Sequence, residues 1–141
     1  MRDFPGIQPD NRLMTSSNAA MAVFLVEDNE LIRENLTIAL EEVAHACLVG
    51  CAAREDEAVA WLTAHPTGWD IAVIDLFLKQ GSGLGVLHAC VARSAHQRAV
   101  VLSNYATEDM RRRCLQGGAD RVFDKSTELD AFLAYCGEAL R

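Results

Sequence analysis

From about residue 21 onward, short apolar runs alternate with segments in which apolar residues recur at the helical period. Short continuous apolar runs are typical of strands that are buried on both faces of a parallel sheet. We expect such strands near residues 22–26, 47–52, 70–74, 98–102 and 121–123. Because a helical segment follows each strand and the connections are short, the pattern predicts an α/β fold with a doubly wound, five-stranded parallel sheet.

Two of the helical segments have an especially clear apolar stripe. The stripe of the first segment consists of Ile32, Leu36, Ala39, Leu40 and Val43. The stripe of the last consists of Leu129, Phe132, Leu133, Cys136 and Leu140. Both spacings place the apolar side chains on one face of a helix, and Ser126 or Thr127 is available as an N-cap for the last helix.

The first twenty residues differ from the rest of the chain. Residues 1–20 mix Pro, Asn, Ser, Asp and Gly without any periodicity, which indicates an irregular extension. Half of the 141 residues are hydrophobic, so the remainder is long enough and apolar enough to build one core. We therefore expect an irregular N-terminal extension at 1–20 and a single domain at 21–141.

Charge and cysteine content exclude several classes of protein. A formal net charge of -7 argues against direct binding of nucleic acid, which requires a basic surface. The five cysteines are odd in number and lack CxxC spacing, so they predict neither disulfides nor a zinc site, and their apolar neighbours predict reduced, buried thiols. Without an apolar run of membrane-spanning length or a secretory signal, we expect a cytoplasmic protein with no membrane partner.

Acidic residues directly follow the first and third expected strands. These are Glu27 and Asp28 after the first strand, and Asp75 after the third. Glu27 and Asp28, taken alone, are more simply explained as helix caps. The carboxyl ends of parallel strands meet at one edge of a sheet, however, where open α/β sheets bind their ligands. Two carboxylates about 4 Å apart repel by roughly 4 kcal/mol at an effective dielectric near 20, so the cluster predicts a cation, and Mg²⁺ suits oxygen ligands.

Two further polar residues follow the last two expected strands. Ser103 closes the fourth strand, and Lys125 follows the fifth after one intervening residue. Alone, the serine is more simply a turn or cap residue and the lysine a solvated surface charge. At the same sheet edge, however, an ammonium group can pair with a carboxylate or a phosphoryl oxygen.

Taken together, these residues resemble the receiver domain of two-component response regulators over roughly residues 21–141. The resemblance rests on Glu27-Asp28, on Asp75 with the Gly81-Ser82-Gly83 segment after it, on Ser103, and on the segment 118–126 that contains Lys125. It implies a flavodoxin-like (βα)5 fold with strand order 2-1-3-4-5. Gly81-Ser82-Gly83 lacks the GxxxxGK[ST] pattern of a phosphate loop, so we interpret it as the loop and cap that open the third helix.

The resemblance also implies a role for each residue. Asp75 would be the phosphoacceptor, with Ser103 and Lys125 contacting the phosphoryl group. The implied ligands of Mg²⁺ are Asp28, Asp75, the backbone carbonyl of Phe77 and, through metal-bound water, Glu27. The phosphodonor would be a sensor histidine kinase or a phosphotransfer protein.

Because the chain ends with the fifth expected helix, we expect a stand-alone receiver that signals by protein contact. An unknown downstream protein would bind the face formed by the fourth helix, the fifth strand and the fifth helix. Val122 stands where many members of the family have an aromatic residue that rotates on activation, and Phe123 is expected to face the other side of the sheet. Phe77 and Tyr105 would add bulk beside the site, which predicts a prolonged phosphorylated state.

Two other functions are compatible with the sequence but fit it less well. One is a Mg²⁺-dependent phosphatase or phosphotransferase with Asp75 as its nucleophile. The second position after Asp75 is Phe77, however, where that chemistry would favour a second carboxylate. The other is a receiver-like interaction module that is never phosphorylated, against which the complete set of polar residues argues. The Arg111-Arg112-Arg113 run indicates a solvated, partly salt-bridged helix face rather than a nucleic-acid patch.

Overall fold

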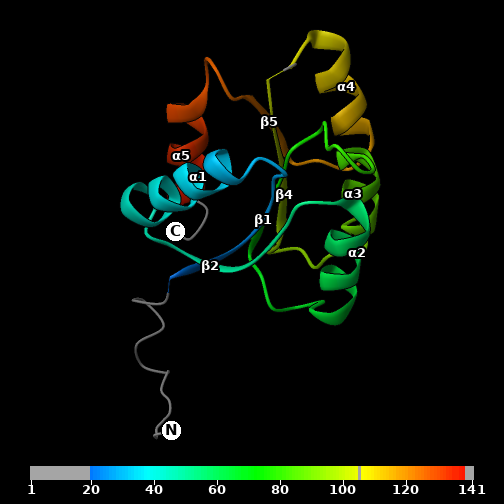
Figure 1. Cartoon of the computed structure of the whole chain (residues 1–141), viewed down its shortest axis with the longest axis horizontal. Coiled ribbons are helices and arrows are strands. Elements are labelled where there is room, and N and C mark those ends of the chain that lie inside the picture. Colours follow the sequence, from blue (N-terminus) through cyan, green and yellow to red (C-terminus); the bar gives the residue numbers. More distant parts are fainter. Residues whose placement is uncertain (1–19, 105, 139–141) are drawn as a thin grey trace, which may run out of the picture.

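The computed structural model describes residues 20–104 and 106–138, so all but the last residue of the expected N-terminal extension lies outside it. Strands and helices alternate along the described chain (Figure 1). In order they are β1 (Met21–Val26), α1 (Glu30–Val43), β2 (Ala46–Ala52), α2 (Glu55–Ala64), β3 (Ile71–Ile74), α3 (Gly83–Ala89), β4 (Arg98–Ser103), α4 (Glu108–Gln116), β5 (Arg121–Asp124) and α5 (Leu129–Glu138). Within 20–104 and 106–138, no helix combines the length and apolarity that a membrane crossing requires.

The strands form one parallel sheet in the order β2-β1-β3-β4-β5, which confirms the predicted topology. Every strand begins and ends within one residue of its expected bounds. Helices α1 and α5 cover one face of the sheet, and α2, α3 and α4 cover the other (Figure 1). This arrangement brings the carboxyl ends of all the strands to the same edge.

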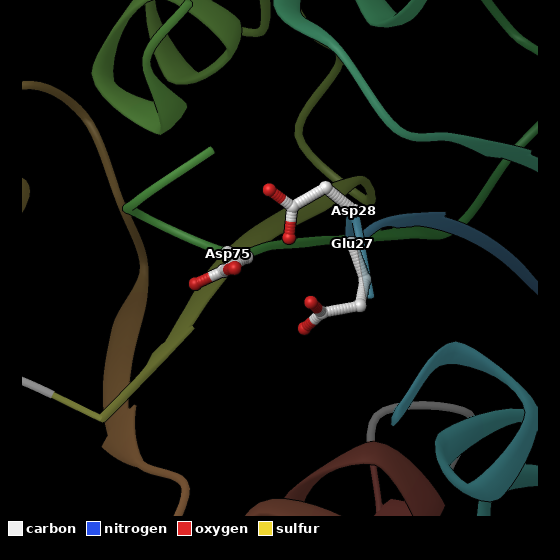
Figure 2. A group of neighbouring side chains, drawn as sticks. All are labelled: Glu27, Asp28 and Asp75. Carbon is white, nitrogen blue, oxygen red and sulfur yellow. The ribbon is translucent and has the colours of Figure 1, made fainter. Parts of the chain in front are cut away.

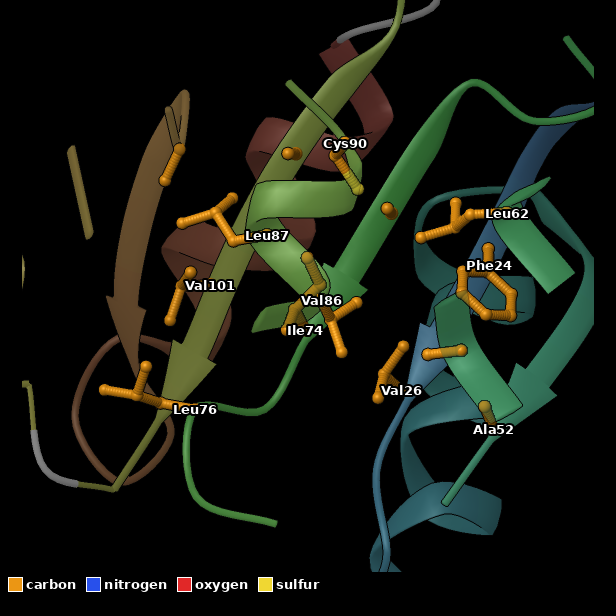
Figure 3. Close-up of a cluster of buried hydrophobic side chains, with 14 of the residues drawn as sticks. Phe24, Val26, Ala52, Leu62, Ile74, Leu76, Val86, Leu87, Cys90 and Val101 are labelled. Carbon is orange, nitrogen blue, oxygen red and sulfur yellow. The ribbon is translucent and has the colours of Figure 1, made fainter. Parts of the chain in front are cut away.

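The central strands divide their side chains between two apolar cores, one on each face of the sheet. In β1, Val23 and Leu25 pack toward α1 and α5, while Phe24 and Val26 pack toward α2 and α3 (Figure 3). Because both faces are covered, the strand is apolar at every position. The expectation of strands buried on both sides is therefore confirmed for the centre of the sheet.

Helix α1 begins where the sequence pattern places it but buries a slightly different set of residues. The side chain of Asn29 caps the helix by accepting a 2.9 Å hydrogen bond from the backbone N–H of Ile32. Leu36 and Leu40 are buried, as expected. The prediction was wrong for Val43, which is 59% exposed, because Ala44 turns into the core directly after the helix.

Helix α5 also buries the predicted stripe, with Phe132, Leu133 and Cys136 inside the core, whereas Leu140 lies outside the described residues. The predicted cap was wrong. The helix begins at Leu129, so neither Ser126 nor Thr127 directly precedes it. Their backbone N–H groups instead donate to the side chain of Asp124, which closes the turn after β5.

The edge strand β2 changes its side-chain register halfway along. Val23 pairs with Leu48 but Phe24 pairs with Gly50, so one extra residue, Val49, is inserted in β2. A one-residue insertion moves all following side chains to the opposite face. Leu48 therefore packs toward α1, while Gly50 faces Trp61 of α2, where a Cβ atom would collide with the indole ring.

This irregular edge strand also explains where the cysteine prediction fails. Cys90, Cys114 and Cys136 are buried free thiols, as expected. Cys47 and Cys51 are exposed, because they lie on β2 at the edge of the sheet. Apolar neighbours in the sequence predicted burial of all five, but an edge strand is covered less completely than a central one.

Candidate functional site

Three carboxylates converge at the carboxyl edge of the sheet, as the sequence predicted. The backbone N–H of Glu27 continues the pairing of β1 by donating to Ala52, and that of Asp75 continues β3 by donating to Val26. These hydrogen bonds fix the backbone positions of Glu27 and Asp75. Glu27, Asp28 and Asp75 each place a carboxylate oxygen within 4.8 Å of the others (Figure 2).

Lys125 reaches this cluster from the end of β5. Its ammonium nitrogen lies 2.5 Å from Oε1 of Glu27 and 3.6 Å from Oδ2 of Asp75. The backbone N–H of Lys125 donates to the carbonyl of Ser103 at the end of β4, and the serine is buried. The fold thus brings the predicted strand-end residues together at one edge.

Glu27 is the most enclosed member of the cluster. Its second carboxylate oxygen accepts a 3.1 Å hydrogen bond from the backbone N–H of Asn29, and its residue is only 2% exposed. The guanidinium of Arg33 donates to the backbone carbonyl of Glu27 and holds this turn in place. Both carboxylate oxygens of Glu27 are therefore engaged within the protein, which favours an indirect role toward a cation.

The pKa of the Asp75 carboxyl group is higher than that of an ordinary aspartate. Burial, together with the charges of Glu27 and Asp28, raises its pKa to about 6, although Lys125 and the backbone N–H of Phe77 act in the opposite direction. A nearby cation would lower this pKa again, because it favours the charged form. The three oxygen donors fit a hard divalent cation, which prefers carboxylate and carbonyl ligands.

The loop after β3 closes one side of the cluster. The backbone N–H of Phe77 lies 3.4 Å from Oδ1 of Asp75, and that of Lys79 donates a 2.7 Å hydrogen bond to Oδ2 of Asp28. Phe77 is half exposed, whereas Tyr105 lies outside the described residues. Sequence reasoning missed the contribution of Lys79, since a backbone donor leaves no signal in the residue type.

The start of α3 packs directly against the backbone of Asp75. Ser82 caps this helix by accepting from the backbone N–H of Leu84, which confirms the predicted loop and cap. A side chain at Gly83 would collide with the backbone carbonyl of Asp75. Glycine at this position therefore allows the helix to approach the site closely.

Arg111 has a more structural role than its place in a run of arginines suggested. Its guanidinium donates to the backbone carbonyls of Ala106 and Val122 and to the carboxylate of Glu128. The hydrogen bond from Arg111 lowers the pKa of Glu128. Arg112 pairs with Asp109 on the exposed side of α4. The prediction of a partly salt-bridged face is confirmed, but Arg111 also joins α4 to β5.

Comparison with known sequences agrees with this geometry. The family model of the response regulator receiver domain matches residues 23–136. The DNA-binding transcriptional activator DevR/DosR of Mycobacterium tuberculosis is 30% identical over 97 residues, which cover 69% of this chain and 44% of that protein. The response regulator UvrY of Escherichia coli O6:H1 is 26% identical over 103 residues, covering 73% and 46%. The chain spans about half the length of these relatives.

Solved structures show the same fold. A response regulator from Burkholderia pseudomallei with a phosphorylated aspartic acid, a calcium ion and citrate superposes with a TM-score of 0.69 and 25% identity, over 86% of this chain and 66% of that one. A chain of the CheX-CheY-BeF3-Mg²⁺ complex from Borrelia burgdorferi gives a TM-score of 0.75 at 21% identity, over 86% and 90%.

Proposed function

The chain belongs to the response regulator receiver domain family, and from this premise we propose that it accepts a phosphoryl group on Asp75. The observation that carries the proposal is the convergence of Asp75, two further carboxylates and the Lys125 ammonium group at one sheet edge. The phosphorylated aspartic acid in the similar Burkholderia structure supports it. The donor would be a sensor histidine kinase or a phosphotransfer protein.

The carboxylate cluster would hold Mg²⁺ during this reaction. Asp28, Asp75 and the backbone carbonyl of Phe77 would be the ligands, and the enclosed Glu27 would act through a water molecule. When bound, Mg²⁺ supplies positive charge that offsets the charge on the phosphoryl oxygens. The similar Burkholderia structure contains a calcium ion, which supports a divalent cation as the partner of this cluster.

The side chains would divide the chemistry of transfer between them. An ionised Asp75 oxygen forms the new bond to phosphorus while the bond from phosphorus to the donor's imidazole nitrogen breaks, and that nitrogen keeps the electron pair and takes up a proton. Lys125 lies 3.6 Å from Asp75, so a small movement would bring its ammonium group onto a phosphoryl oxygen. The Ser103 hydroxyl, at the end of β4, would donate to another.

The signal would leave through the face formed by α4, β5 and α5, where a downstream protein would bind. Val122 offers no aromatic ring to rotate, but Arg111 links the three elements by another means. It ties the loop before α4 to Val122 of β5 and to Glu128 at the start of α5. Glu128 also accepts a hydrogen bond from the backbone N–H of Asp124, next to Lys125.

Intact-mass measurement after incubation with Mg²⁺ and acetyl phosphate tests the proposal. We expect the wild type to gain one phosphoryl group, Asp75→Asn to gain none, and the exposed control Asp130→Asn to behave as the wild type. Turnover of acetyl phosphate without an adduct would support a phosphatase instead. If no adduct forms even with candidate kinases, the chain is a silent interaction module.

A further inference from the structure

Glu55, the first residue of α2, inserts its side chain against the start of α3. Oε1 of Glu55 accepts a 2.8 Å hydrogen bond from the backbone N–H of Ser82. A Cβ atom at Gly81 would collide with the Glu55 side chain, and a Cβ atom at Gly85 would overlap its Oε2. The two glycines therefore form a socket whose shape fits this carboxylate.

The backbone of the same glutamate also contacts the loop that connects β3 to α3. Its N–H donates to the carbonyl of Gln80 at 3.2 Å, so Glu55 holds the end of the loop at two points. The middle of the loop is held at Lys79, whose N–H donates to Asp28. At the far side of the socket, Gly83 packs on the backbone of Asp75. Glu55 is thus connected to the carboxylate cluster through the β3–α3 loop, whose backbone is hydrogen-bonded at Lys79, Gln80 and Ser82.

The neighbouring acids of α2 have other partners. Asp56 pairs with Arg54, and Glu57 accepts from the backbone N–H of Ala53. Of the three acids in the first turn, Glu55 is the one with a hydrogen bond to the β3–α3 loop among the described residues. A carboxylate is well suited to this task, since it accepts strongly from backbone N–H groups and is favoured near a helix N-terminus.

We propose that Glu55 is a positioning residue for phosphorylation, an inference that rests on the proposed function. By seating its carboxylate among Gly81, Ser82 and Gly85, Glu55 fixes the loop that follows Asp75. The fixed loop presents the Phe77 carbonyl and the Asp75 carboxylate to the cation in one geometry. Loss of this brace lets the loop move, which weakens cation binding before any phosphoryl transfer takes place.

Cation affinity and loop protection test the inference on the full chain without relying on phosphorylation. Supporting residues behind a metal site typically change its affinity by 10 to 100-fold, so Glu55→Ala is expected to raise the Mg²⁺ dissociation constant by about tenfold. NMR titration gives that constant, and amide exchange in the absence of Mg²⁺ should be faster at Ser82. Glu55→Gln keeps an acceptor and should restore part of both properties, while Glu57→Ala should match the wild type.

Gly85→Ala provides a second test that leaves Glu55 in the chain. Its methyl group takes the space of Oε2, so the variant should weaken Mg²⁺ binding as Glu55→Ala does. In the double variant the methyl group enters vacated space, and we expect no further loss. Additive losses, or an unchanged dissociation constant and Ser82 exchange in Glu55→Ala, would overturn the inference. Failure of the wild type to form an adduct would refute the proposed function alone, since neither measurement depends on it.

Discussion

Lys125 donates a 2.5 Å hydrogen bond to Glu27, a residue 98 positions earlier in the chain. The Glu27 side chain is 2% exposed and that of Lys125 is 11% exposed, so the pair is almost entirely removed from water. A buried carboxylate without a cation is strongly disfavoured. The position of the Lys125 ammonium group is therefore set by Glu27 more than by Asp75.

Removing the lysine charge should destabilise the metal-free protein. Lys125→Met leaves Glu27 buried and uncompensated, and loss of one partner of a buried ion pair typically costs about 3 to 5 kcal/mol. Urea denaturation without divalent cations measures the change. Lys79→Met, at an exposed lysine, is the matched control and should change little. If the double variant Glu27→Gln, Lys125→Met regained no stability, the argument from the buried charge would be wrong.

Asp75→Asn should stabilise the metal-free protein at neutral and alkaline pH. The pKa of Asp75 is raised from 3.8 to about 6, so the folded state holds this proton more tightly than the unfolded state. That contribution to stability is present at low pH and is lost as the pH rises from about 4 through 6, at a cost of at most about 3 kcal/mol. Asparagine removes the dependence.

The measurement is urea denaturation of both proteins between pH 4 and pH 8. The advantage of Asp75→Asn should grow with pH and level off above pH 7. Glu41→Gln neutralises an exposed acid of α1 and should show no such trend. A constant difference between Asp75→Asn and the wild type at all pH values would contradict the raised pKa.

Mg²⁺ should stabilise the folded chain through Asp28. At a free concentration one hundred times its dissociation constant, a ligand that binds only the folded state adds about 2.7 kcal/mol. Thermal unfolding with and without Mg²⁺ measures this gain, which Asp28→Asn should reduce. The Lys79 amide, which donates to Asp28, should shift during an NMR titration. An unchanged Lys79 resonance at saturation would argue against Asp28 as a ligand.

Phe77→Ala should shorten the life of the phosphorylated state. Phe77 follows Asp75 by two residues and is half exposed, so its ring would hinder the water that attacks the phosphoryl group. Intact mass followed over time after removal of acetyl phosphate gives the half-life. Phe77→Leu keeps much of the bulk and serves as the control. Equal half-lives in the wild type and the alanine variant would remove the shielding argument.

Arg111→Met should loosen the junction between α4 and β5. The variant loses two hydrogen bonds to backbone carbonyls and the ion pair with Glu128, which suggests a loss of about 1 to 3 kcal/mol in the free energy of unfolding. Arg112→Met is a control on the same helix, where an exposed ion pair contributes within about 0.5 kcal/mol. Equal effects of the two substitutions would show that the carbonyl contacts of Arg111 do not matter.

The sequence predicted the structure best where an apolar run forms a strand that is buried along its whole length. The central strand β3 is buried at every position, so its apolar run marked both the strand and the acid that follows it. The burial of the edge strand β2 was not predictable from its sequence, because the insertion of Val49 exchanges the two faces without altering the apolar composition of the run. Cys47 and Cys51 are exposed because β2 lies at the edge of the sheet.

By itself, the sequence determined the order of strands and helices, the family, and the residues that meet at the carboxyl edge, because each depends on short apolar runs and on the residue directly after them. Their chemical roles stay predictions. The tertiary structure decided that Lys125 pairs more closely with Glu27 than with Asp75, and that Glu55 fits between Gly81 and Gly85. These contacts join residues far apart in the chain, and their geometry depends on how whole helices pack, which no local pattern records.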